Sequence, residues 1–257
     1  MRRDSLIKGT ISIVVLIIVW ILAVTQLDIS RTFLPAPWDI GRAFISMAPY
    51  LPRAIAASLR ITMTGFFLGI FVGISMGLMM AYSRNFMEIA GPMMEFTRPV
   101  PVFALIPLFM IWFGLGLMPQ IMLIALGVSG VLGVQTYEAI RNIPMVYINA
   151  SANLGAGKNV IFRTVILPYI FPHIIGAIRV AAAASWGLNV AAEFMGVQTG
   201  LGFIMIVRQM FLDTPGIITV VLIYSVLAIC LDQVIRMVER RLTRWTDRSK
   251  MSLEQLK

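Results

Sequence analysis

The sequence predicts an all-α membrane protein with about six transmembrane helices, and three observations lead to this fold class. Of the 257 residues, 59% are hydrophobic and only 13% are charged. Apolar runs of about 20 residues, the length of helix that crosses a bilayer, recur along the chain. One polar segment punctuated by glycine, Tyr147 to Pro168, interrupts these runs. We therefore expect membrane-crossing helices with one exposed segment between them.

Each expected span has the length and hydropathy of a transmembrane helix. The spans cover residues 9–25, 55–81, 90–112, 116–136, 173–193 and 215–236. The first follows MRRDSLIKGT, but its apolar run is long for a secretory signal and no clear cleavage site follows, so we expect an uncleaved span. We treat residues 1–257 as a single transmembrane domain with its core at 55–236.

Lysine and arginine set the expected orientation, because positively charged flanks stay in the cytoplasm. Both termini and the polar segment are then cytoplasmic, and topology accounts for most of the net charge of +9. We therefore expect no nucleic-acid partner. The basic residues assigned to the cytoplasmic side are Arg2, Arg3, Lys8, Arg84, Arg98, Arg141, Lys158, Arg163 and those from Arg236 to Lys257, most of which lie in a basic tail at 237–257.

The chain offers few groups for catalysis or metal binding. Cys230 and His173 are its only cysteine and histidine, which argues against a disulfide within the chain and against a metal site of the usual type. The stretch GAGKN is not a phosphate-binding loop, because GxxxxGK[ST] requires glycine at Ala152 and Ser or Thr at Asn159. We expect no enzyme activity and no cofactor bound by this chain.

The second expected span carries a glycine every four residues, at Gly65, Gly69, Gly73 and Gly77. This spacing places the four on one helix face, where another helix can approach closely. The partner helix belongs either to the same chain or to a second subunit.

The start of the third expected span is rich in proline. Pro99, Pro101 and Pro107 each lack a backbone donor. They predict a broken or bent helix at this point.

Three side chains of the fifth expected span carry polar groups although the span is expected to lie in the membrane. Trp186, Asn189 and Glu193 fall within two helical turns on one side of it. A charged group there is costly unless it is paired or functional. The three face either a translocation path or a neighbouring helix.

The sequence of the polar segment predicts two short helices joined by a turn, which we call the elbow. Asn142 and Pro144 predict a helix start, and the turn lies at Asn153, Gly155 and Gly157. A second helix is expected over Lys158 to Ile166, ended by Leu167 and Pro168. The elbow is either a docking surface or an amphipathic linker at the membrane interface.

These residues resemble the permease subunits of bacterial ABC importers. That family's signature is Glu-Ala-Ala, three residues, Gly, nine residues, then a hydrophobic residue, any residue and Leu-Pro. Asn149 stands at the Glu position in this chain. It is followed by Ala150, Ser151, Gly155, Val165, Leu167 and Pro168.

Other stretches resemble the nitrate, sulfonate and taurine branch of this family, so that the similarity covers about residues 34 to 245. They are FLPAPWDI, RPVPVFALIPLFMIWFGLG, WGLNVAAEFMG with the following GLG, and LDQVIRMVERRLTRW.

The resemblance implies the type I importer permease architecture in the bacterial inner membrane, with a coupling loop at 137–172. Asn149, Ala150, Ser151, Gly155, Gly157, Leu167 and Pro168 would then couple the chain to its ATPase. The implied partners are two ATPase subunits that use ATP and magnesium, an external or lipid-anchored solute-binding protein, and a second permease copy, expected as a homodimer. The expected function is import of small anions or organic acids.

Two other functions remain open at this point. A self-sufficient secondary transporter or channel would need no ATPase, although the internal repeats typical of many such transporters are not evident. The motif Gly127-Val128-Ser129-Gly130 resembles the GxSG of rhomboid-type intramembrane proteases, which pair the serine with a histidine. The only candidate partner, His173, lies at the cytoplasmic edge, roughly 10 Å from Ser129 in depth.

Overall fold

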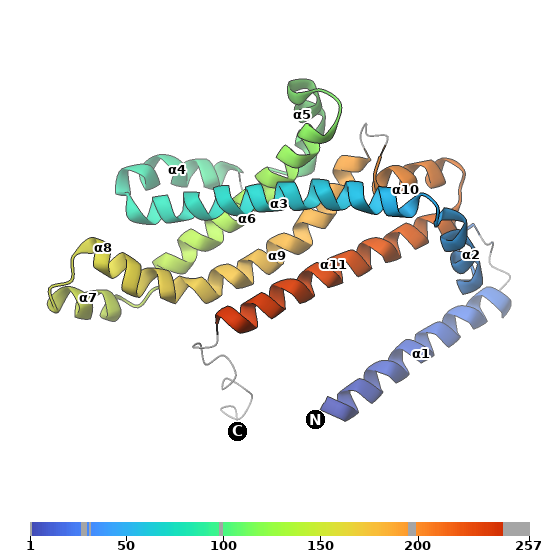
Figure 1. The fold of residues 1–257 in the computed structure, drawn as a ribbon, viewed down its shortest axis with the longest axis horizontal. Coiled ribbons are helices and arrows are strands. Elements are labelled where there is room, and N and C mark those ends of the chain that lie inside the picture. The colour runs from blue at the N-terminus through green and yellow to red at the C-terminus, as the bar shows by residue number, and fades with distance from the viewer. Residues whose placement is uncertain (1, 27–29, 31, 98–99, 195–198, 244–257) are drawn as a thin grey trace. The chain divides into compact units, whose positions relative to one another are not determined.

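The computed structural model describes residues 2–26, 30, 32–97, 100–194 and 199–243, and the regular elements in these ranges are helices (Figure 1). A 3₁₀ turn, η1 (Val102–Leu105), precedes α5, and a π-helical turn, η2 (Phe162–Ile166), precedes α9. The α-helices are α1 (Arg2–Gln26), α2 (Pro37–Met47), α3 (Leu51–Tyr82), α4 (Arg84–Thr97), α5 (Ile106–Phe113), α6 (Leu117–Arg141), α7 (Met145–Asn153), α8 (Lys158–Ile161), α9 (Leu167–Glu193), α10 (Leu201–Met210) and α11 (Thr214–Leu242).

Contacts within the chain define two compact units. Unit 1 comprises Met1–Ser58 and Gln198–Ser225, and unit 2 comprises Leu59–Val197 and Val226–Lys257. The expected division of a single domain into core, loop and tail stays a prediction.

Four helical stretches among the described residues are long and apolar enough to cross a membrane. They are Leu51–Tyr82, Leu117–Arg141, Lys158–Glu193 and Thr214–Leu242, and they contain the spans expected at 55–81, 173–193 and 215–236 and nearly all of that at 116–136. The first expected span, 9–25, lies within α1. The described part of α1 contributes a shorter apolar helix, Val14–Gln26.

The expected span 90–112 is interrupted, as its prolines predicted. Helix α4 ends at Thr97, and helical structure begins again at Val102. Pro101 precedes η1, and Pro107 occupies the first turn of α5, where its missing donor costs no helical hydrogen bond. Proline thus divides the apolar stretch, as its spacing predicted; Pro99 lies outside the described residues.

The expected end of the second elbow helix at Leu167 and Pro168 was wrong. Helix α8 continues through η2 into α9, and the backbone N–H of Leu167 donates to the carbonyl of Phe162, five residues earlier. This wider turn shifts the hydrogen-bond register ahead of Pro168, which has no N–H of its own. The elbow and the fifth span therefore form one continuous helical path.

Helices α6 and α9 pack side by side and form the core of unit 2 (Figure 1). Ile124, Val128 and Leu132 of α6 are fully buried in one apolar cluster with Ala181 of α9. A second cluster near the end of α6 joins Ala139 and Ile143 to Ile170 and Ile174.

The four glycines of α3 lie against α6 of the same chain. A methyl group on Gly69 would lie 2.6 Å from the Cβ of Val128, and one on Gly73 would lie 2.6 Å from the carbonyl oxygen of Ser129. Both separations are shorter than carbon and oxygen atoms tolerate without movement of the backbone. Glycine is therefore what allows the two helices to approach this closely.

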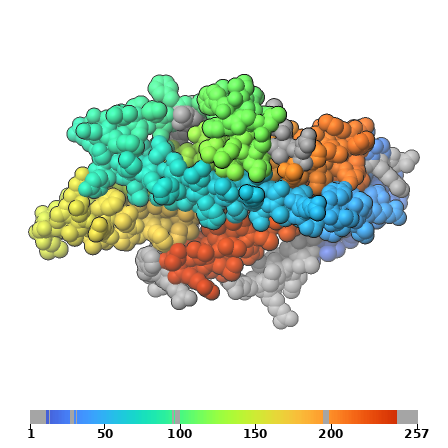
Figure 2. All heavy atoms as spheres, turned by 45° about the horizontal axis from the view of Figure 1, so that its top comes forward, coloured from blue at the N-terminus to red at the C-terminus, as the bar shows by residue number. Residues whose placement is uncertain are grey.

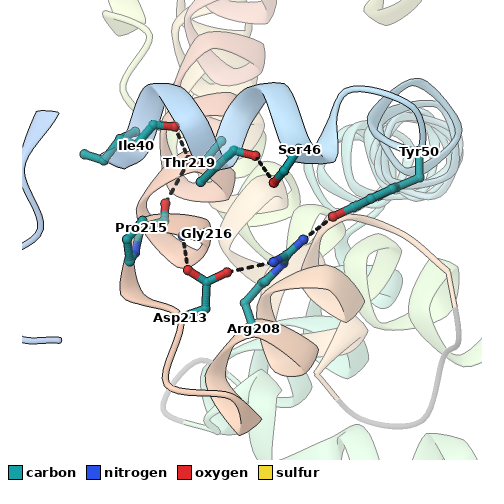
Figure 3. A network of polar contacts seen from close by, with 9 residues as sticks. Ile40, Ser46, Tyr50, Arg208, Asp213, Pro215, Gly216 and Thr219 are labelled. Atoms are coloured by element: carbon teal, nitrogen blue, oxygen red, sulfur yellow. Dashed lines mark hydrogen bonds and ion pairs between the residues drawn. The ribbon is translucent and has the colours of Figure 1, made fainter. Parts of the chain in front are cut away.

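Unit 1 contains a polar network around the turn between α10 and α11 (Figure 3). Asp213 accepts a hydrogen bond from the backbone of Gly216 at 3.1 Å and forms an ion pair with Arg208 at 2.7 Å. Arg208 also donates to the hydroxyl of Tyr50. Burial acts to lower the pKa of the Arg208 guanidinium, but its hydrogen bonds to Asp213 and Tyr50 outweigh this effect and raise the pKa. The network fixes the start of α11.

We predict that Gly73→Ala lowers the thermal stability of the purified protein, measured by tryptophan fluorescence in detergent. The added methyl group meets backbone atoms of α6 that cannot move independently, at a cost of about 1–3 kcal/mol. Gly176→Ala in α9 is the matched control, because a methyl group there meets no atom within 4 Å. Equal melting temperatures for the two variants would contradict close packing at Gly73.

Candidate functional site

Most residues of α7 and α8 are exposed, and Figure 2 shows this yellow segment at the surface. Helix α7 buries none of its residues. Apolar side chains are exposed on and beside it, including Met145 at 62%, Val146 at 66% and Leu154 at 88%. A short helix that leaves such groups uncovered has the character of a protein-docking surface.

A hydrogen-bonded cap ends α7. The N–H of Gly155 donates to the carbonyl of Ala152 at 2.9 Å, and the N–H of Ala156 donates to that of Ser151 at 3.1 Å. This pair of bonds is a Schellman motif, which requires a left-handed residue after the helix. Gly155 supplies it with φ of +81°.

The reason for glycine at 155 is therefore its backbone conformation. A methyl group there would meet no atom within 4 Å in this chain. Gly157 has an ordinary φ of −71° and precedes α8 as its N-cap. The two glycines of the elbow thus differ in the constraint that they satisfy.

Side chains of helix α8 bind the end of α3. The Lys158 ammonium donates to the backbone carbonyl of Tyr82 at 2.9 Å and lies 4.3 Å from the centre of its ring. The Tyr82 hydroxyl donates to the side-chain oxygen of Asn159 at 3.0 Å, and its ring meets Phe162 edge to face. Helix α8 is therefore bound to α3 through side chains and is continuous with α9 through η2.

The residues of the sequence signature occupy different parts of this elbow. Asn149 and Ala150 are exposed on α7, and the hydroxyl of Ser151 donates to the carbonyl of Tyr147 at 2.9 Å. Leu167 and Pro168 begin α9. The signature thus marks both arms of the elbow.

Trp186, Asn189 and Glu193 are buried in unit 2, and no more than 5% of any of them is exposed. The side-chain amide of Asn189 donates to the Glu193 carboxyl at 3.0 Å. Their place in a translocation path stays a prediction.

Gln120, which no sequence motif singled out, joins this region from α6. It is 3% exposed, and its amide nitrogen donates to the carbonyl of Ala192 at 3.4 Å. Its amide oxygen is buried without a hydrogen-bond partner among the described residues. A glutamine within an apolar span is a sequence signal for a buried polar site. The sequence could not show its neighbours, because these depend on how α6 packs on α9.

A charged network between α9 and α11 was not predicted from the sequence either. Arg179 pairs with Asp232 at 2.9 Å and lies 3.6 Å from the carboxylate of Glu239, and Asp232 binds Arg236 at 2.7 Å. About a third of the Arg179 and Asp232 side chains is exposed. These partners neutralise charges that the lipid would otherwise disfavour. The described residues contain no group of three His, Cys, Asp or Glu side chains arranged for a metal ion.

Comparison with known proteins identifies the chain's relatives. Residues 65–244 match the family model "Binding-protein-dependent transport system inner membrane component". The chain belongs to this family. The match includes the elbow, α9 and all of α11.

Named relatives agree with this assignment. The taurine transport system permease protein TauC of Escherichia coli is 32% identical over 251 residues, which are 95% of this chain and 90% of TauC. The putative aliphatic sulfonates transport permease protein SsuC of the same species is 31% identical over 90% of this chain and 88% of its own length.

Solved structures show the same fold. A chain of the MetNI methionine ABC transporter in an inward-facing conformation superposes with a TM-score of 0.68 at 21% identity, over 77% of this chain and 98% of its own length. A chain of a bacterial ABC transporter involved in the import of the acidic polysaccharide alginate superposes with a TM-score of 0.64, over 94% of this chain and 97% of its own length. The all-helical importer permease fold is thereby confirmed.

The protein is a non-catalytic membrane component of an ABC importer, and this family supports neither of the two other functions considered from the sequence. The GxSG-like stretch has a packing role instead. A methyl group on Gly127 would lie 2.4 Å from Leu188 of α9, and the hydroxyl of Ser129 donates to the carbonyl of Leu126 at 2.9 Å.

We predict that Gly155→Ala loosens the end of α7. A left-handed conformation costs an alanine about 1–2 kcal/mol, so hydrogen exchange at the Ala156 amide is expected to accelerate roughly tenfold. Gly155→Asn is expected to exchange more slowly than Gly155→Ala, because asparagine tolerates this conformation better. Gly157→Ala is the control and should leave the rate unchanged; equal acceleration by both alanines would contradict the Schellman assignment.

We predict that Gln120→Leu keeps or raises the melting temperature of the purified protein. The change removes a buried oxygen without a partner and loses only one long hydrogen bond. Gln120→Glu, which adds a charge at the same place, is expected to lower it. A clear loss of stability in Gln120→Leu would show that the amide oxygen is bound by a group outside the described chain.

Proposed function

We propose that this protein is the membrane permease of an ATP-driven importer of small anions or organic acids, of the nitrate, sulfonate or taurine type. The observation that carries the proposal is the elbow. The elbow exposes apolar side chains on α7. It is bound to α3 by the hydrogen bond from Lys158 to Tyr82, and its helix α8 continues into α9. The surface suits a cytoplasmic ATPase, and the two connections suit the transmission of its movement.

In the proposed mechanism, closure of two ATPase subunits on ATP and magnesium pushes α7 and α8. A rigid helix transmits such a push, whereas a flexible loop would absorb it. The Schellman cap at Gly155 stiffens the turn between the two arms. The displacement then reaches α3 through Tyr82 and α9 through η2, and the spans change the side to which the cavity opens.

The proposed assembly contains two copies of this chain, two ATPase subunits and an external solute-binding protein. With the elbow on the ATPase side, both termini face the cytoplasm, in agreement with the distribution of basic residues. The homodimer, the binding protein and this orientation are parts of the proposal.

The proposed substrate class comes from the named relatives, which transport taurine or are putative sulfonate permeases. Asn189 and Glu193 with the neighbouring Trp186 are proposed to line the path in one of its states. Their burial in the present arrangement requires α9 to move before a solute can reach them.

We predict that Gly155→Glu abolishes transport while membrane insertion is kept. The change imposes a left-handed conformation on a side-chain residue and adds a charge to the docking surface. The experiment co-expresses the tagged chain with its ATPase, then measures co-purification of the ATPase and ATP-dependent uptake of taurine, an alkanesulfonate and nitrate by proteoliposomes.

Gly157→Glu separates the two effects, because it adds the same charge two residues away without the backbone strain. Loss of ATPase binding in Gly155→Glu supports the elbow as the docking site. Normal uptake by Gly155→Glu would sink this assignment, and wild-type uptake without any ATPase would contradict the ATP-driven importer itself. Uptake of none of the three solutes, with ATPase bound, would overturn only the substrate class.

A further inference from the structure

A groove of about 440 Å³ lies in unit 2 beside the elbow, and its walls come from helices distant in sequence. It opens between the end of α3, the start of α4, the last turns of α6 and the start of α8. The lining residues are Met80, Ala81, Tyr82, Arg84, Met87, Tyr137, Ile140, Arg141 and Lys158.

The groove is strongly basic. Arg84, Arg141 and Lys158 contribute three positive charges, and none of the described residues that line it is acidic. Lys158 is held in position by the Tyr82 carbonyl and ring. Arg84 pairs with Glu88 outside the lining, but both side chains are largely exposed, so that this ion pair is weak and readily exchanged.

The position of the groove along the spans indicates the kind of anion that it meets. The candidate spans α3 and α6 end at Tyr82 and Arg141, and both residues line it. The groove therefore lies at the ends of two candidate spans, and we infer that it reaches the level of lipid headgroups. Tyrosine is enriched at this level of membrane proteins, and two tyrosines line the groove.

The remaining lining is apolar. Met80, Ala81, Met87 and Ile140 stand beside the three charges. A soluble anion uses only the charges, whereas a phospholipid uses both parts, with its phosphate at the cations and the start of its chains against the apolar wall. Basic pockets between spans on the cytoplasmic side are suited to anionic headgroups.

We propose that this groove binds the headgroup of an anionic phospholipid, and that the bound lipid fixes the start of the coupling elbow. The inference rests on the proposed function, which places the elbow on the cytoplasmic side. The phosphate lies among Arg84, Arg141 and Lys158, so one lipid connects α4, α6 and α8. Lipid occupancy then stabilises the position of α8 from which the ATPase drives the spans.

The test measures lipid retention by native mass spectrometry of the full-length chain, purified in mild detergent and offered phosphatidylglycerol or phosphatidylcholine. Wild type is expected to retain phosphatidylglycerol preferentially. Arg141→Gln should reduce this preference about fivefold, the usual effect of one basic residue at an anionic surface. Arg84→Gln should act in the same direction.

Arg241→Gln is the matched control, because this exposed arginine of α11 does not line the groove. An equal loss in Arg241→Gln would overturn the site in favour of general surface attraction. Binding of inorganic phosphate without lipid retention would assign the groove to a soluble anion and overturn the lipid. Unchanged retention in both groove variants would also overturn it.

A second arm tests the consequence for coupling. The complex with its ATPase is reconstituted in nanodiscs with or without phosphatidylglycerol, and ATP hydrolysis is measured. Stimulation by phosphatidylglycerol in wild type and Arg241→Gln, with a loss in Arg141→Gln, supports the proposal. A drop in ATPase binding for Arg141→Gln in pure phosphatidylcholine would show that the groove contacts the ATPase instead. Lipid retention is read without transport, so failure of the importer proposal and failure of this one are distinguishable.

Discussion

The close approach of α3 to α6 is the constraint on which the arrangement of unit 2 depends. Apolar helices gain little from the hydrophobic effect inside a bilayer, so their association depends on packing at short range. The glycine face of α3 provides this by bringing its backbone against Ile124, Val128 and Ser129. This packing also positions the end of α3, where Tyr82 contacts Lys158 and Asn159 of the elbow.

Beyond Tyr82, short-range polar contacts rather than helix packing connect the elbow to α3. Lys158 and Asn159 bind Tyr82, while η2 carries α8 into α9 without a break. The elbow is thus joined to two spans at once, one by side chains and the other by the backbone. In the proposed mechanism the elbow moves with the spans, and the proposed lipid site in the basic groove adds a further contact beside it.

Two charged side chains within the spans, Arg179 and Glu193, have partners, as the low dielectric of a bilayer favours. Arg179 finds Asp232 and Glu239 across the gap between α9 and α11, and Glu193 accepts a hydrogen bond from Asn189 one turn away. The Arg179 network joins two helices and restrains their relative rotation.

The sequence alone determined the membrane class, most of the spans, the proline interruption before α5, the elbow and the family, because hydropathy, proline and glycine act through neighbouring residues. The local backbone of the structure showed that Gly155 serves a left-handed cap and that Leu167 and Pro168 continue a helix. Only the tertiary structure decided that the glycine face packs within the chain and that Gln120 approaches α9. The groove depends on the same cause, since Arg84, Arg141 and Lys158 are far apart in sequence. Such features follow from how helices align in space, which no local pattern encodes.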